Sequence, residues 1–284
     1  MLISEQERLT TTRDGVGIRY SCSDFSSAKP ALLFVIPFGL NLEIAQPFID
    51  CFKDAFRVIC WEARLILAPA EHAVSEKELT VEHHVADLFA VLDACDVEQA
   101  HIVGYCSGAG IALAAVNANP DRFDTLVLVS GDYALLRQSA CVTQHGRDID
   151  SLLPMASKDR KMAQFILERL SEDRKQSGAR EVPEGIKMPF SQAHFFQRYA
   201  LNYLSYRSTN FEELASTVNK RTLLIACERD LQTNVHSSMQ IQKHIKNSSI
   251  IVEPEGDHYE LLRDATRVMG ITRDFLTGAY EGVA

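Results

Sequence analysis

Short, continuous apolar runs recur along the chain and alternate with longer segments in which apolar residues follow helical spacing. Runs of this length are typical of strands that are buried on both faces of a parallel sheet. We expect such strands at 31–37, 56–61, 100–105, 125–130, 221–227 and 249–253. Helices are expected between them, and the resulting βαβ alternation predicts a mostly parallel, doubly wound α/β sheet.

The remaining segments of this core carry local signals of their own. Residues 7–24 alternate loosely between apolar and polar positions around Asp14-Gly15, a pair typical of a tight turn, so an opening hairpin is expected. Helices are expected at 42–54, from Thr80 to Cys95 with Thr80 as the N-cap, after the strand at 100–105, at 234–246 and at the C-terminal end.

From 134 to 219 this alternation stops, because the segment is charged, follows helical spacing and has no continuous apolar run. An insertion between two parallel strands is most naturally a helical cap over the carboxyl edge of the sheet, where open α/β sheets bind ligands. We therefore expect a core domain of 1–133 and 220–284 and a helical cap insertion of 134–219. Four aromatic residues of the cap recur at helical spacing, which favours a packing face over a substrate wall: Phe195, Tyr199, Tyr203 and Tyr206.

Composition narrows the class of protein. The 284 residues are 46% hydrophobic and 24% charged, which fits a folded α/β domain and excludes disordered and fibrous classes. The net charge of −9 argues against nucleic acid as a partner, and no apolar run reaches the roughly 18 residues that span a bilayer. Since the N-terminus also lacks a basic region followed by an apolar segment, we expect a cytoplasmic protein without a membrane partner.

The seven cysteines are scattered along the chain, and no two of them form a C-x-x-C pair. This spacing suggests neither a disulfide framework nor a zinc site, and it favours a reducing compartment in which a reactive thiol survives. His83 and His84 are neighbours on an expected helix, so they cannot both face one metal ion. We therefore expect no metal and no bound cofactor.

One expected strand ends in the motif GYCSG at 104–108, and a helix of small residues comes directly after it. A nucleophile on a strained strand-to-helix turn needs residues without bulk two positions before and after it. Gly104 and Gly108 meet this need for Cys106, whereas Ser107 would have a tyrosine and an alanine at those positions. We interpret Cys106 as the nucleophile; the alternative is a tightly packed turn in which Cys106 is a small buried hydrophobe.

Two later strand ends supply the groups that activate a thiol. Asp230 follows the strand RTLLIAC, and His258 follows the last strand in the run EGDHYELL. An imidazole generates the thiolate, and a carboxylate fixes the imidazole tautomer and stabilises the imidazolium. Cys106, Asp230 and His258 are expected to converge at one edge of the sheet. Asp132, after the preceding sheet strand, is the alternative acid, and Asp257 is expected to hydrogen-bond within its own loop.

The order of nucleophile, acid and histidine resembles that of the α/β-hydrolases, and the GYCSG, CERD and EGDHYELL motifs extend the resemblance over 31–278. It implies an α/β-hydrolase fold and two backbone N–H donors for an oxyanion, those of Ser107 and Phe38, with Gly39 as the neighbouring choice for the second. The loop that holds Phe38 departs from the common His-Gly sequence. Three residues near these positions are candidates for substrate binding: Tyr105, Gly39 and Asp132.

A cysteine nucleophile alters the fate of the acyl group. An oxygen ester lies downhill from a thioester, whereas cysteine exchanges one thioester for another at nearly equal free energy, so Cys106 favours acyl transfer to a second thiol. Among the cysteine-bearing branches, the chain most resembles the standalone thioesterase-like aminoacyltransferases of nonribosomal peptide assembly, in its size, the position of its elbow and its cap insertion. That resemblance implies an aminoacyl thioester of phosphopantetheine or coenzyme A as the substrate group.

An acidic carrier protein, the partner that this resemblance implies, would meet basic residues at the mouth of the cap. Two groups are candidates, with a solvated helix face as the alternative: Lys158, Arg160 and Lys161, and Arg174 and Lys175. Two other functions stay open. The same three side chains would serve a hydrolase of thioesters, esters or lactones, and a noncatalytic relative would only bind a small molecule, although it has no reason to keep the base and its acid.

Overall fold

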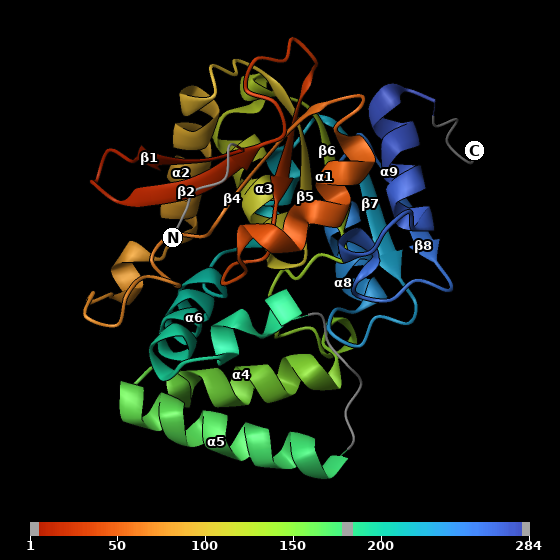
Figure 1. The fold of residues 1–284 in the computed structure, drawn as a ribbon. Coiled ribbons are helices and arrows are strands. Elements are labelled where there is room, and N and C mark those ends of the chain that lie inside the picture. The colour runs from red at the N-terminus through yellow and green to blue at the C-terminus, as the bar shows by residue number, and fades with distance from the viewer. Residues whose placement is uncertain (1–5, 178–183, 280–284) are drawn as a thin grey trace.

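The computed structural model describes residues 6–177 and 184–279, and the strands of this part of the chain form one eight-stranded sheet (Figure 1). The strands are β1 (Glu7–Thr11), β2 (Gly17–Cys22), β3 (Ala31–Val35), β4 (Arg57–Trp61), β5 (Ala100–Tyr105), β6 (Phe123–Val129), β7 (Arg221–Cys227) and β8 (Ser248–Glu253). They lie in the order β1-β2-β4-β3-β5-β6-β7-β8. β2 pairs antiparallel with β1 and β4, and all other neighbours pair parallel.

This sheet confirms the predicted fold class. The opening hairpin is present, and each of the six predicted buried strands lies within two residues of its expected bounds. Along β5 the side chains alternate between two separate cores, with Ile102 in one and Val103 and Tyr105 in the other. The apolar runs of β3 to β7 therefore reflect strands that are mostly buried, whereas β8 lies at the edge of the sheet and is half-buried along most of its length.

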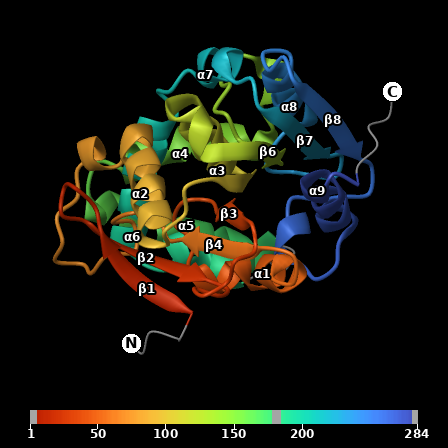
Figure 2. The ribbon, with the colours of Figure 1, turned by 90° about the horizontal axis from the view of Figure 1, so that it is seen from above.

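Helices cover both faces of the sheet (Figure 2). α1 (Gln46–Phe52) and α9 (Arg267–Thr277) pack on one face, and α2 (Val81–Ala94), α3 (Ser107–Ala118) and α8 (Val235–Gln242) pack on the other. This is the arrangement of a doubly wound sheet, in which the carboxyl ends of the parallel strands share one edge.

Two of the predicted helices show how local signals set their ends. Thr80 caps α2 as expected, because its hydroxyl oxygen accepts a hydrogen bond from the His83 N–H. The helix expected at 42–54 is divided, with a 3-10 turn over Leu42–Ala45 before α1 begins at Gln46. Pro47 explains the division, since proline lacks an N–H and is tolerated only in the first turn of an α-helix.

The insertion between β6 and β7 is helical and lies along the carboxyl edge of the sheet (Figure 1). It contains α4 (Gln144–Ala156), α5 (Arg160–Ser177), a 3-10 segment (Glu184–Phe190), α6 (Ala193–Tyr206) and α7 (Phe211–Thr217). α4, α5 and α6 pack on one another, whereas α7 packs against α3 and α8 of the core. Residues 178–183, between α5 and the 3-10 segment, lie outside the described residues.

Two buried contacts attach α6 to the core. The Arg198 guanidinium donates hydrogen bonds to the backbone carbonyls of Ala68, Pro69 and His72, and His84 Nε2 of α2 lies 2.6 Å from Asn202 Oδ1. No helix in the described ranges combines the length and the apolar character that crossing a membrane requires.

Candidate active site

Cys106 occupies a strained turn between β5 and α3. Its φ of 52° and ψ of −123° lie in a region that non-glycine residues rarely adopt. A Cβ on Gly104 would lie 2.6 Å from Ala109 Cα, and a Cβ on Gly108 would lie 2.1 Å from Val35 O. The predicted need for small residues on both sides of Cys106 is therefore confirmed, because neither position has room for a side chain.

Asp230 and His258 lie within hydrogen-bonding distance of each other. His258 Nδ1 lies 2.8 Å from Asp230 Oδ2, and both side chains are buried. The Asp230 carboxylate also accepts hydrogen bonds from the N–H groups of Gln232 and Thr233 and from the Thr233 hydroxyl. These bonds fix the carboxylate and leave His258 Nε2 as the ring nitrogen that is free to serve Cys106.

The electrostatics of this group favour a protonated imidazole. Burial alone lowers the pKa of His258, but the charges of Asp230 and Cys106 and hydrogen bonds to both side chains raise it to about 10. Burial would raise the pKa of Asp230, but the charge of His258 and its hydrogen bonds lower it. The arrangement thus stabilises an imidazolium beside a cysteine sulfur.

Tyr105 has a different place from the one expected for a substrate-binding residue. Its hydroxyl donates a 2.6 Å hydrogen bond to the carbonyl of His258, and its side chain is buried with 1% exposure. The ring packs beside the His258 imidazole. Tyr105 therefore holds the histidine loop and does not line the cavity next to Cys106.

Asp132 lies beside Cys106 and not at the histidine. Its backbone N–H donates to the carbonyl of Cys106 at 3.1 Å, and Oδ1 accepts from the Ala134 N–H at 3.0 Å. Burial raises the pKa of Asp132, while the Ala134 bond and the positive charge of His258 act in the opposite direction. Asp230, and not Asp132, is thus the carboxylate that contacts Nδ1 of His258.

The two expected oxyanion donors are neighbours. Ser107 is the first residue of α3, where an N–H has no acceptor within the helix and points toward the carboxyl edge. The Phe38 N–H donates to Ser107 Oγ at 3.3 Å, so it lies next to this site. Gly39, in contrast, lies against the cap, because a Cβ there would lie 2.8 Å from Pro189 Cγ and 3.1 Å from Tyr199 Cδ2.

A cavity of about 80 Å³ opens beside Cys106, between the end of β6, the start of α4 and α6. Tyr199 and Tyr203 form part of its wall, and both also pack in or against the hydrophobic core, as the expected packing role requires. Tyr206, the last of the four aromatic residues predicted to pack, lies in the hydrophobic core, and its hydroxyl donates a hydrogen bond to the carbonyl of Asp132. These tyrosines of α6 therefore contribute both to packing and to the wall of the cavity.

Sequence reasoning did not find several residues of this site. Gln232 and Thr233 hold Asp230, and Thr143 joins the start of α4 to this loop by a hydrogen bond from its hydroxyl to the Gln232 carbonyl. An aspartate three residues before a threonine, as Asp230 is before Thr233, is a local signal for such a turn. His145 of α4 also lines the cavity, but nothing in its sequence context indicates this.

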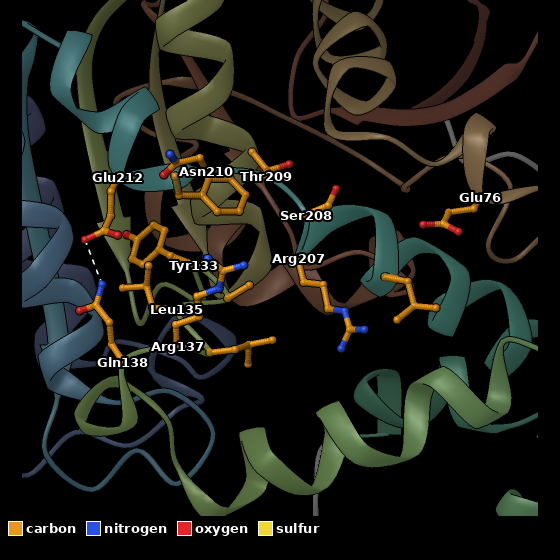
Figure 3. Close-up of a pocket in the computed structure, with 14 residues that line it drawn as sticks. Glu76, Tyr133, Leu135, Arg137, Gln138, Arg207, Ser208, Thr209, Asn210 and Glu212 are labelled. Atoms are coloured by element: carbon orange, nitrogen blue, oxygen red, sulfur yellow. Dashed lines mark hydrogen bonds between the residues drawn. The ribbon is translucent and has the colours of Figure 1, made fainter.

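Figure 3 shows a larger cleft, and residues 134–136 line both this cleft and the cavity beside Cys106. Its volume is about 820 Å³, and Arg137 and Arg207 contribute charged side chains to it. Arg207 pairs with Asp150 of α4, and Gln138 donates a hydrogen bond to Glu212 across the cleft. Among the described residues, no group of three or more His, Cys, Asp or Glu side chains could hold a metal ion.

Comparisons with known proteins agree with this architecture. A family model described as the alpha/beta hydrolase fold matches residues 49–265. L-allo-isoleucyltransferase of Pseudomonas savastanoi pv. glycinea is 26% identical over 260 residues, 89% of each chain. A putative carbamate hydrolase, RutD, of Caulobacter sp. (strain K31) is 34% identical over 89 residues, 30% of this chain and 31% of that protein.

Solved structures show the same fold. The crystal structure of a hydrolase from Pseudomonas aeruginosa PA01 superimposes with a TM-score of 0.73 at 19% identity, covering 96% of this chain and 99% of that one. At this level of identity the likeness concerns the fold alone. Since the family model matches most of the chain and the sheet has the corresponding architecture, the chain belongs to the α/β-hydrolase fold family.

Proposed function

We propose that this protein transfers an acyl group, and in particular an aminoacyl group, from one thioester to another through a covalent thioester on Cys106. The observation that carries the proposal is a cysteine on a strained elbow whose charge acts on a buried histidine, and the Nδ1 of that histidine lies 2.8 Å from a buried carboxylate. The likeness to an L-allo-isoleucyltransferase over 89% of both chains supports the aminoacyl class.

The proposed reaction has two matched halves. The Cys106 thiolate attacks the carbonyl carbon of the donor thioester, and the Ser107 and Phe38 N–H groups stabilise the oxyanion. The carbon–sulfur bond to the donor then breaks, and the donor thiol leaves with the proton of His258. In the second half, an acceptor thiol gives its proton to His258, attacks the acyl-Cys106 carbonyl and releases the Cys106 thiolate. One thioester is consumed and one is formed.

Cysteine suits this exchange because both halves join sulfur to carbon, so the intermediate is close in free energy to donor and product. The natural thiols of this kind are those of phosphopantetheine and coenzyme A. We propose an acidic carrier protein as the partner that presents them. Lys158, Arg160 and Lys161 are exposed around the start of α5 and provide a positive surface for it, whereas the side chains of Arg174 and Lys175 lie outside the described residues.

Intact-protein mass spectrometry tests the proposal. The protein is mixed with aminoacyl-pantetheine thioesters, and a mass increase equal to the acyl group is expected. The Cys106→Ala variant should show no increase, whereas Cys51→Ala, which changes a half-buried cysteine of α1 next to Arg273 of α9, should still be acylated. Addition of coenzyme A or pantetheine should then remove the acyl group as a new thioester.

A second candidate function is hydrolysis by the same residues, which the local match to a putative carbamate hydrolase favours. In that case the acyl group would leave as free acid at a rate independent of the added thiol. The absence of any adduct or turnover over a broad panel of acyl thioesters would contradict both enzymatic functions and leave a small-molecule-binding relative of the family.

A further inference from the structure

The cavity beside Cys106 contains a carboxylate that the exchange of thioesters does not require. Asp132 is the only Asp, Glu, Lys or Arg among the described residues that line this cavity. It is half-buried there, and only one of its two carboxylate oxygens, Oδ1, has a hydrogen-bond donor within the described residues. No described Lys or Arg lines this cavity, and His258, whose positive charge acts on Asp132, is already paired with Asp230. A carboxylate removed from bulk water is costly unless a bound group pairs with it.

The backbone holds Asp132 firmly in this position. Its N–H donates to the Cys106 carbonyl, and its carbonyl accepts from the Tyr206 hydroxyl. Ser130 and Ala134, on either side, have φ values of 45° and 49°, which cost on the order of 1 kcal/mol each for non-glycine residues. The fold thus maintains a strained segment that presents one carboxylate next to the nucleophile.

The geometry of an aminoacyl thioester fits such a carboxylate. In an aminoacyl-cysteine, three bonds separate the sulfur from the α-nitrogen, so the ammonium group lies at most about 4 Å from Sγ. A residue that recognises this ammonium must therefore be a neighbour of the nucleophile. Tyr199 and Tyr203 line the same cavity, and aromatic rings favour a nearby cation as well as an apolar side chain.

We propose that Asp132 binds the α-ammonium group of the aminoacyl thioester and so selects aminoacyl groups over simple acyl groups. This inference rests on the proposed acyl transfer at Cys106. The ammonium gives Asp132 a cationic partner of its own, since His258 is paired with Asp230, and the bound carboxylate also holds the carbonyl carbon in front of the sulfur. Acyl groups without an α-amine, or with a blocked one, leave Asp132 unpaired and are loaded slowly.

Single-turnover loading of Cys106 from alanyl-pantetheine and propionyl-pantetheine tests this, followed by quenching and intact mass measurement at about pH 6.5, where an α-amine is largely protonated. These two substrates differ only in the amine. The wild-type protein should load alanyl faster than propionyl by about ten- to a hundredfold, the range of a charge-assisted hydrogen bond. N-acetylalanyl-pantetheine should load as slowly as propionyl, a result that needs no variant.

The Asp132→Asn variant should lose most of this preference, with alanyl loading reduced about ten- to a hundredfold and propionyl loading changed less than about threefold. Asp148→Asn is the matched control, because it removes one negative charge from the exposed face of α4, outside the cavity. Equal loading of alanyl and propionyl by the wild-type protein would overturn the role of Asp132 and leave acyl transfer standing. Equal slowing of both substrates in Asp132→Asn would also overturn it, and no loading of either would refute acyl transfer as well.

Discussion

At the scale of single residues, Asp230 controls the proton of His258. Because the Asp230 charge raises the pKa of His258, the imidazolium that would protonate the leaving thiol in the proposed transfer persists through neutral pH and is lost only as the pH rises toward about 10. Asp230→Asn removes that charge, so the pKa of His258 falls and the alkaline decline of the transfer rate should move to lower pH. The rate at neutral pH should also drop by roughly a hundredfold or more.

Asp257, the residue before His258, provides the control for this prediction, in which the transfer rate is measured as a function of pH. Asp257 accepts from the Tyr259 N–H and pairs with Arg263 at 2.9 Å, as expected for a residue that hydrogen-bonds within its own loop. Asp257→Asn should therefore keep the wild-type alkaline decline. An unchanged profile in Asp230→Asn would show that His258 does not depend on Asp230 for its proton.

The sequence could predict that Cys106, Asp230 and His258 lie near one another because each comes within five residues of the end of a strand, and parallel strands end at one edge. It could not predict that the Tyr105 hydroxyl reaches the His258 carbonyl or that Tyr199 turns toward the cavity. Those contacts depend on side-chain directions and on the packing of the cap, which strand patterns do not contain.

At the scale of elements, the packing of α3 against β3 depends on a glycine. A Cβ on Gly108 would lie 2.1 Å from the Val35 carbonyl oxygen, a backbone atom that cannot move aside without shifting the strand. Gly108→Ala should therefore lower the free energy of unfolding by about 3 kcal/mol or more, measured by denaturant titration. Gly270 of α9 has open space around its Cα, so Gly270→Ala should raise the stability by about 0.5–1 kcal/mol.

These two glycines also show what local patterns predict about elements. The GYCSG motif indicates a close approach at Gly108, because the turn requires it, whereas Gly270 gives no such signal and meets no neighbour. The number and order of the buried strands follow from hydrophobic runs, but the division of the helix expected at 42–54 follows from one proline. Wild-type stability of Gly108→Ala would contradict the close packing of α3 on β3.

At the scale of the whole molecule, the sequence predicts the cap, because the continuous apolar runs typical of strands stop between 134 and 219. The sequence does not predict how the cap is attached to the core. Arg198 of α6 is buried with 3% exposure and donates to three carbonyls of the loop between β4 and α2. These carbonyls belong to an irregular segment, in which the Pro69 carbonyl also accepts a hydrogen bond from the His72 N–H. One side chain thus joins the cap to a segment more than 120 residues earlier in the sequence.

Arg198→Met tests this attachment, because it keeps most of the apolar stem and removes the donors. Loss of the three bonds from a buried guanidinium should cost on the order of 2–4 kcal/mol, and the cost should be local to α6 and the loop around Pro69. Hydrogen exchange should therefore speed up at those amides and stay slow in β5 and β6. Since α6 carries Tyr199 and Tyr203 into the cavity, the KM for aminoacyl thioesters should rise as well. Uniformly faster exchange over the sheet would show instead that Arg198 stabilises the entire fold and not the cap alone.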